Sequence, residues 1–261
     1  MEALIPRHQD ILDIAKREGR VDVDGLADTF DVTPQTIRKD LNYLCDKDRL
    51  ERVHGGAIYP SGVTNYAYES RRMHAALEKE VIGKAAAQLI PDNASLILNI
   101  GTTTEQVARA LVRHDGLMVI TNNINVANIL HELSNADVVV AGGMLRKSDG
   151  GLVGEATIDF IEQFKVDFAV IGVSAIDADG SLLDYDYREV RISQTILQHA
   201  RKTILVSDSM KFERNAPVRI GHLSDIDIFV VDKTPSEEIQ QICRDAETQI
   251  VVASPSNSEH A

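Results

Sequence analysis

The spacing of apolar positions divides the chain into two parts. Over the first 60 residues, apolar side chains recur three and four positions apart, which is the spacing of helices with one buried face. This spacing predicts helices over 6–16, 24–30 and 34–44. From Ser95 onward, short β-branched runs alternate with helical stretches, a pattern typical of parallel sheets covered by helices. The chain therefore predicts a small helical domain followed by an α/β domain.

The third predicted helix has a defined start and one buried stripe. Thr33 is suited to cap the free amides of its first turn, and Pro34 fits the first helical position because its φ is fixed. The apolar residues that recur at i, i+4 and i+7 are Ile37, Leu41 and Leu44. Gln35 and the other polar residues of this segment are therefore expected to point outward.

The segment that follows predicts a hairpin and then a linker. Residues 50–59 have the composition of two short strands that meet at the glycine pair Gly55–Gly56. Three helices and a hairpin predict a winged helix-turn-helix DNA-binding domain over residues 3–58. Residues 59–74 are interpreted as a linker that enters a helix-rich bridge.

The rest of the chain predicts one α/β domain over residues 75–253 and a disordered tail over 254–261. Its apolar runs predict strands at 96–100, 117–121, 137–141, 168–173, 203–206, 226–231 and 250–252. The helices expected between them cover 104–113, 126–133, 156–164, 190–200 and 235–247. The fold class is α/β, with an open and mostly parallel sheet.

Charge restricts where nucleic acid can bind. The 261 residues carry a net charge of −13, and residues 57–261 alone carry −10. Residues 33–56, by contrast, hold five basic and four acidic side chains. Because phosphate contacts need local positive charge, only the N-terminal domain is suited to DNA.

Composition also bears on the compartment. The longest uncharged apolar run, Phe168–Ile176, is far shorter than the ~18 residues of a membrane-spanning helix. The two cysteines, Cys45 and Cys243, are too few for a disulfide framework. We therefore expect a cytoplasmic protein with no membrane partner.

The outward face of the third helix carries side chains that read DNA. Gln35 and Asn42 are suited to pair with adenine, and Arg38 with guanine, in the major groove of double-stranded DNA. The residues expected at phosphates are Thr33, Thr36 and Lys39, with Arg52 and His54 added from the hairpin. The alternative is an ordinary solvated helix face.

A second candidate site lies in the α/β domain. The sequence Gly101-Thr102-Thr103-Thr104 follows an apolar strand and opens a helix, so free amides and hydroxyls converge at the positive end of a helix dipole. Asn122 and Gly143 follow neighbouring strands at the same carboxyl edge, where open α/β sheets place ligands. Lys211 is expected to supply a fixed positive charge. The further cationic candidates are Arg146, Arg188, Arg191 and Arg214, which the sequence leaves unranked.

The candidate segments of the α/β domain also allow other interpretations. The threonine loop alone also fits a simple N-capped turn, and Asp184 and Asp186 are interpreted as a solvated loop rather than an acid–base pair. The eight histidines lack metal-ligand spacing, and no nucleotide-binding or serine-hydrolase motif is present. We expect no metal, no cofactor and no catalytic residue.

The chain resembles the DeoR-type repressors. The residues that carry the resemblance are Thr33 to Asn42, His54 to Ala57, Glu78 to Glu80, Ile100 to Thr104, Thr121 to Asn128, Ala141 to Gly143 and Lys211-Phe212. They cover both domains, roughly residues 5 to 250. The sequence departs from the usual family pattern at Asn99, where an Asp is common, and at Glu213, where a Gly is common.

The resemblance implies a repressor whose sheet domain is similar to the sugar-phosphate-binding domains of ribose-5-phosphate isomerases. The segments 145–157, 184–191 and 214–216 are most similar to members of the family that sense glycerol 3-phosphate, which implies this effector. A homo-oligomer, either dimer or tetramer, is expected because two-fold symmetric proteins read paired half-sites. The alternatives are another sugar phosphate as effector, or a sugar-phosphate isomerase or transferase with accessory N-terminal helices.

Overall fold

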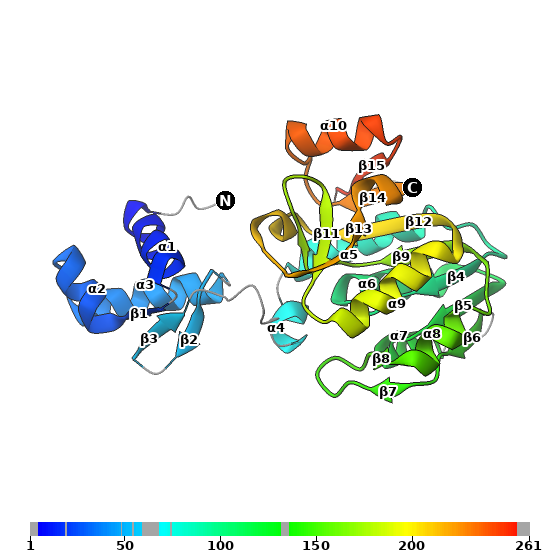
Figure 1. The fold of residues 1–261 in the computed structure, drawn as a ribbon, viewed down its shortest axis with the longest axis horizontal. Coiled ribbons are helices and arrows are strands. Elements are labelled where there is room, and N and C mark those ends of the chain that lie inside the picture. The colour runs from blue at the N-terminus through cyan, green and yellow to red at the C-terminus, as the bar shows by residue number, and fades with distance from the viewer. Residues whose placement is uncertain are drawn as a thin grey trace, which may run out of the picture. The chain divides into compact units, whose positions relative to one another are not determined.

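The chain forms two compact units, residues 1–64 and 65–261, each with its own hydrophobic core (Figure 1). The computed structural model describes residues 5–18, 20–47, 49–53, 55–58, 68–73, 75–131 and 136–254. Residues 59–67 of the expected linker, the tail from 255 onward and His54 therefore lie outside the described residues.

The N-terminal unit is a winged helix-turn-helix, as predicted. Its helices are α1 (Pro6–Glu18), α2 (Val23–Phe30) and α3 (Pro34–Asp46). Its strands are β1 (Arg20–Asp22), β2 (Glu51–Val53) and β3 (Gly56–Ile58), paired antiparallel in the order β1-β3-β2. The sequence predicted the hairpin of β2 and β3 but not β1.

Local chemistry explains how these elements connect. The Asp22 carboxylate caps α2 by accepting a 2.7 Å hydrogen bond from the Gly25 amide. Asp31 ends α2 in the left-handed region, at φ 51°. A β-carbon at Gly56 would lie 2.1 Å from the Val21 carbonyl oxygen, so β1 can pair with β3 only because this residue is glycine.

The second unit is built on seven parallel strands in the order β15-β14-β12-β9-β4-β5-β6. Every strand predicted for this domain is in the sheet: β4 (Ser95–Leu98), β5 (Leu117–Thr121), β6 (Ala136–Val140), β9 (Val166–Ile171), β12 (Ala200–Ser207), β14 (Ile228–Val231) and β15 (Gln249–Val252). The chain order reverses between β4 and β9, and such a reversal marks the ligand crevice of open α/β sheets.

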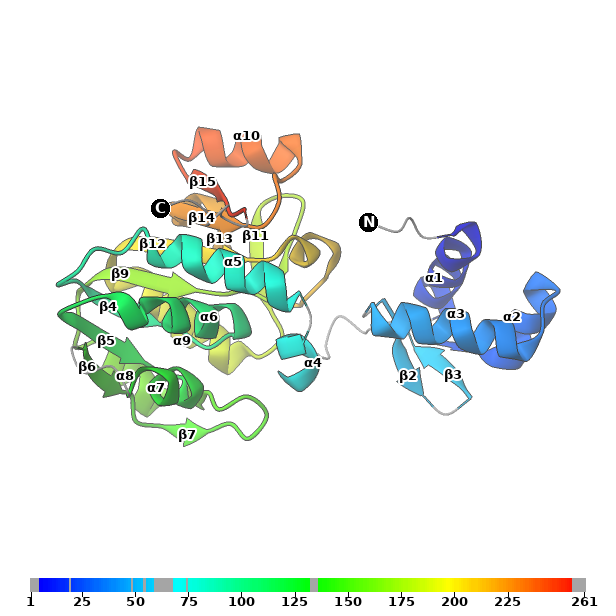
Figure 2. The same cartoon turned by 180° about the vertical axis from the view of Figure 1, so that it is seen from behind.

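Helices cover both faces of the sheet. One face packs on α5 (Ala76–Ala87), α6 (Thr102–Ala110) and α7 (Ile124–Leu130), seen in front of the sheet in Figure 2. The other packs on α8 (Glu155–Ile161), α9 (Tyr187–Gln198) and α10 (Glu237–Asp245). Successive strand residues alternate between the faces: Leu96 and Leu98 belong to the first core and Ile97 to the second.

Short elements at the edges were not predicted. They are the hairpin of β7 (Met144–Leu145) and β8 (Leu152–Val153), the sheet of β10 (Ala175–Ile176), β11 (Ser181–Asp184) and β13 (Val218–His222), and the 3-10 turns η2 (Ser209–Glu213) and η3 (Leu223–Asp225). The helix α4 (Tyr68–Met73) lies in the expected helix-rich bridge, and the 3-10 turn η1 (Leu111–Arg113) ends the helix expected over 104–113. β7, β8 and β10 have two residues each and are too short to show a periodic pattern. Among the described helices, none is long and apolar enough to span a membrane.

Candidate functional site

The outward face of α3 presents the predicted DNA-reading side chains together. Thr33 caps the helix: its hydroxyl accepts from the Thr36 amide at 3.2 Å and lies 2.9 Å from the Thr36 hydroxyl. Ile37, Leu41 and Leu44 are fully buried. The exposed residues of the helix include Gln35, Arg38, Lys39 and Asn42. On the wing, Arg52 is exposed on β2.

A buried carboxylate on α3, which sequence reasoning missed, fixes this helix on α1. Asp40 accepts a 2.7 Å hydrogen bond from Arg7 Nε and lies 3.1 Å from His8 Nε2. The His8 ring stacks on Tyr43 of α3, with 4.7 Å between ring centroids. The sequence could have indicated this burial, because Asp40 lies next to Leu41 and one turn after Ile37, at the margin of the apolar stripe.

The threonine loop lies at the carboxyl end of β4, where the strand order reverses. Gly101 has φ 154° and precedes α6, which has no side-chain cap. The Thr104 hydroxyl donates to the carbonyls of Asn99 and Gly101, at 2.8 and 2.7 Å, and so braces the loop. The amides at the start of α6 remain without intrahelical partners, as in anion-binding helix termini.

Asn122 and Gly143 follow β5 and β6 at the same edge. Asn122 is fully buried; its Nδ2 donates to the Leu152 carbonyl at 3.3 Å, and its Oδ1 has no hydrogen-bond partner among the described residues. Gly143 has φ 147°, and a β-carbon there would lie 2.1 Å from Thr157 Oγ1. Gly143 is thus set against α8, while Asn122 presents a buried acceptor at the sheet edge.

Lys211 lies in η2, after β12 at the same edge. Its side chain is buried, and its ammonium makes no hydrogen bond with any described residue. Burial, and after it Arg214, Lys79 and Arg71, lower the pKa of Lys211 to about 7, against the opposing effect of Asp208. The buried ammonium thus lies within the electrostatic reach of other cations and of the carboxylates of Asp208 and Asp184.

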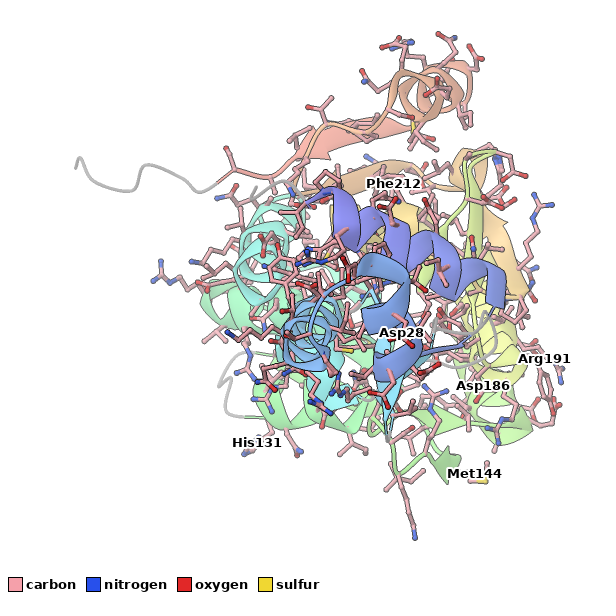
Figure 3. All side chains as sticks on the ribbon, turned by 90° about the vertical axis from the view of Figure 1, so that its left-hand side faces the viewer. Asp28, His131, Met144, Asp186, Arg191 and Phe212 are labelled. Carbon is pink, nitrogen blue, oxygen red and sulfur yellow. The ribbon has the colours of Figure 1, made fainter. Side chains whose placement is uncertain are left out.

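Three of the four candidate arginines are held by carboxylates. Arg146 binds Asp149 through two contacts, Nε to Oδ1 at 2.9 Å and Nη2 to Oδ2 at 2.6 Å, and also contacts Asp186 and Glu189. Burial opposes the charge of Arg146, but Glu189 and Asp149 outweigh it and raise its pKa. The remaining pairs are Arg188 with Asp186 and Arg191 with Glu155, both at α9, whose Asp186 and Arg191 are labelled in Figure 3.

The interpretation of Asp184 and Asp186 as a solvated loop was wrong for Asp184. Asp184 is buried at the end of β11, and burial raises its pKa. Burial likewise raises the pKa of Glu189 to about 8, with a further contribution from Asp184. Asp186 is instead hydrogen-bonded to Arg188, which lowers its pKa to about 2.

A polar network between α4, α6 and α7 also escaped sequence reasoning. The Tyr68 hydroxyl of α4 donates to Glu105 of α6, at 2.8 and 3.0 Å from its two oxygens. Asn125 Nδ2 lies 3.1 Å from both the Tyr68 hydroxyl and Glu105 Oε1. The burial of Lys79 could have been predicted from the sequence, because this lysine lies on the same stripe of α5 as the buried Ile82 and Gly83.

These features define a winged helix-turn-helix regulator joined to an α/β sensor domain. Residues 7–63 match the DeoR-like helix-turn-helix domain, and residues 74–233 match the DeoR C-terminal sensor domain. The chain belongs to the DeoR family of transcription regulators.

Curated relatives cover nearly the whole chain. The glycerol-3-phosphate regulon repressor of Haemophilus influenzae is 46% identical over 94% of this chain and 96% of its own. The protein of the same name from Escherichia coli is 43% identical, over 94% and 97%. The transcriptional repressor CsqR of Escherichia coli is 36% identical, over 95% of both chains.

Solved structures overlap only part of the fold. Ribose 5-phosphate isomerase A from Neisseria gonorrhoeae covers 51% of this chain and 52% of that chain, with a TM-score of 0.38 and 10% identity.

Proposed function

We propose that this chain is a transcriptional repressor of glycerol and glycerol 3-phosphate metabolism genes, and that glycerol 3-phosphate releases it from operator DNA. Residues 3–58 are the DNA-binding domain, 75–253 the effector domain, 59–74 the linker and 254–261 the tail. The protein acts in the cytoplasm as a homo-oligomer, because paired operator half-sites require at least two copies of α3.

The observation that carries the effector proposal is the buried Lys211 ammonium at the carboxyl edge of the sheet. It has no hydrogen-bond partner among the described residues, and Arg214, Lys79 and Arg71 act on it electrostatically, as do Asp208 and Asp184. A phosphate group carries roughly −1.5 to −2 charge at pH 7 and three acceptor oxygens, and so satisfies this edge. The names of the two relatives above support glycerol 3-phosphate in particular.

We propose different roles for the candidate residues at this edge. Lys211, Arg214, Asn122 and the amides of Gly101 to Thr103 are the proposed contacts. Thr104 and Gly143 shape the backbone, since their neighbours are Asn99 and Thr157. Arg146 positions the buried acids around it rather than binding the ligand.

The DNA proposal assigns base reading to Gln35, Arg38 and Asn42, with phosphate contacts from Thr33, Thr36, Lys39 and Arg52. This assignment is supported by the exposure of Gln35, Arg38, Lys39 and Asn42, which lie on the face of α3 that points away from its buried stripe. His54, outside the described residues, is kept as a further phosphate contact on the grounds of sequence.

Operator binding titrated with three phosphates tests this proposal. Fluorescence anisotropy with an operator from a glycerol-metabolism promoter is expected to show release by glycerol 3-phosphate, and none by fructose 6-phosphate or inorganic phosphate. Specific binding that ignores all three would reject the effector but keep the repressor. Release by fructose 6-phosphate alone would assign another sugar phosphate as the effector, which is the second candidate.

We further propose that the chain binds its effector without converting it. The names of the two relatives above, both repressors, support this, and Asp149 at this edge is held by Arg146. Incubation of the full chain with glycerol 3-phosphate or ribose 5-phosphate, followed by mass spectrometry and chromatography, is expected to return each compound unchanged. Conversion of either compound would reject the proposal that the chain binds its effector without catalysing a reaction.

A further inference from the structure

The first helix of the sensor unit carries an arginine that is only weakly held. Arg71 lies in α4, directly after the segment that connects the two units in sequence. Its side chain is 13% exposed, and within the described part of the chain it forms an ion pair with Asp149, from Nη2 to Oδ2 at 3.3 Å. Its Nε is buried and has no hydrogen-bond partner among the described residues. A buried guanidinium donor without an acceptor costs free energy, which a ligand oxygen would recover.

Asp149 does not depend on Arg71 for its compensation. Arg146 engages both of its carboxylate oxygens at 2.9 and 2.6 Å, and the Gly151 amide donates to Oδ1 at 3.2 Å. The contact with Arg71 is the longest of these. Arg71 can therefore leave Asp149 without leaving a buried carboxylate unpaired, which would be costly.

Arg71 shares its neighbourhood with Lys211. Both Arg71 and Lys79 lie near enough to Lys211 to lower its pKa, after the larger effects of burial and Arg214. The Lys79 ammonium also donates to the Arg71 carbonyl oxygen, which ties the backbone of α4 to α5. An anion at Lys211 therefore lies within the electrostatic reach of α4.

The same helix is joined to the threonine loop through Tyr68. Its hydroxyl donates to Glu105 in the first turn of α6, and it accepts from Asn125 of α7. A displacement at the start of α6 is thus transmitted to α4 through hydrogen bonds, and a displacement of Arg71 reaches α4 directly.

We propose that Arg71 couples the effector site to the DNA-binding unit: the bound phosphate takes the Arg71 guanidinium from Asp149, and α4 moves with it. This inference rests on the proposed function, since it concerns the same effector. The bound state gains a two-point contact between guanidinium and phosphate that the free state lacks. Because α4 adjoins the chain segment leading to the helix-turn-helix, that difference is one the DNA-binding units can sense.

The test separates effector binding from effector response in the full-length chain. Four proteins are compared: wild type, Arg71→Ala, Arg71→Lys, and Arg72→Ala as the control, because Arg72 is the exposed neighbour on the same helix. Calorimetry measures the affinity for glycerol 3-phosphate, and anisotropy measures operator affinity without effector and at saturation. Thermal unfolding of each variant confirms that it is folded.

We expect Arg71→Ala to bind operator as the wild type does in the absence of effector, and to bind glycerol 3-phosphate about ten-fold more weakly. At saturation its operator affinity should change less than about two-fold, while the wild type changes by a factor within the usual 5- to 150-fold range of such couplings. Arg71→Lys, which keeps the charge but not the fork, should bind tightly enough to saturate and still release less operator than wild type. Arg72→Ala should match wild type in both measurements.

Two results would overturn this inference alone: an Arg71→Ala protein that releases operator as fully as wild type at saturation, or a folded Arg71→Ala protein that no longer binds operator without effector. A wild type that neither binds nor responds to glycerol 3-phosphate would instead reject the proposed function and this inference with it. The wild-type titration therefore distinguishes the two failures.

Discussion

Arg7 Nε donates to the buried carboxylate of Asp40 across 2.7 Å and so links α1 to α3 inside the N-terminal unit. The Asp40 side chain is 10% exposed and that of Arg7 29%. Together with the contact from His8, this pair sets the angle at which α3 presents its polar face.

Removal of this carboxylate should destabilise the N-terminal unit. Asp40→Ala leaves Arg7 and the buried His8 without their acceptor, and we expect its unfolding free energy to fall by about 1–3 kcal/mol. Asp28→Ala is the control, because Asp28 is exposed on α2 (Figure 3). Urea unfolding of the full chain, followed by circular dichroism, measures both. Equal midpoints for the two variants would show that the Arg7–Asp40 pair contributes nothing to stability.

The exposed cations of α3 should have separable roles on DNA. Arg38→Ala is expected to weaken operator binding by about 1–3 kcal/mol and to relax base preference at one position of each half-site. Lys39→Ala should weaken binding to all sequences and reduce the salt dependence of log K by about one per protomer. Lys84→Ala, an exposed lysine of α5 in the other unit, should change neither. A base preference unaltered in Arg38→Ala would contradict its assignment as a reader.

Two adjacent glycines should respond differently to the same substitution. Gly143 has φ 147° and meets Thr157, whereas a β-carbon at Gly142 meets nothing within 4 Å. Gly143→Ala should therefore cost about 1–3 kcal/mol of stability, and Gly142→Ala almost nothing. Thermal unfolding compares them. A Gly143→Ala protein as stable as Gly142→Ala would mean that the backbone after β6 relaxes freely.

The buried charge of Lys211 should lower the stability of the protein and strengthen its binding of the effector. Its pKa falls from 10.5 to about 7 on folding, so between these pH values the unfolded chain holds a proton that the folded chain lacks. Wild-type stability therefore gains from this group as pH rises through that window. Lys211→Met removes the buried charge, so its stability advantage should be full below pH 7 and shrink toward pH 10.

The same variant should lose at least about ten-fold in affinity for glycerol 3-phosphate, because a charged hydrogen bond is removed. Unfolding at pH 6.5 and 9, with calorimetry at pH 7, measures the two effects, and the exposed Lys202→Met is the control. Unchanged effector affinity in Lys211→Met would exclude Lys211 from the site.

The elements with strong periodicity were predictable, because each carries its own burial pattern. The helix beginning at Pro34 has a cap, a proline and an apolar stripe within the twelve residues from Thr33 to Leu44, and each of the seven sheet strands contains an apolar run. β1 is different: Arg20–Asp22 alternates polar and apolar over three residues and is a strand only because Gly56 lets β3 approach.

The site was predictable where chemistry is local and not where it depends on the packing of distant segments. The threonine loop and Lys211 follow strands, and this position together with the family resemblance made them candidates. Arg71 meets Asp149 78 residues away, and Arg146 meets Glu189 43 residues away. No spacing rule connects such pairs, so the carboxylates that hold Arg146, and the burial of Asp184, emerge only from the fold.

The coupling between effector and operator is tested most directly by measuring it from the effector side. Calorimetry gives the affinity for glycerol 3-phosphate of the free protein and of the protein saturated with operator. Because linkage is reciprocal, we expect operator to weaken effector binding by the same factor by which effector weakens operator binding. Equal effector affinities in the two states would contradict release by glycerol 3-phosphate.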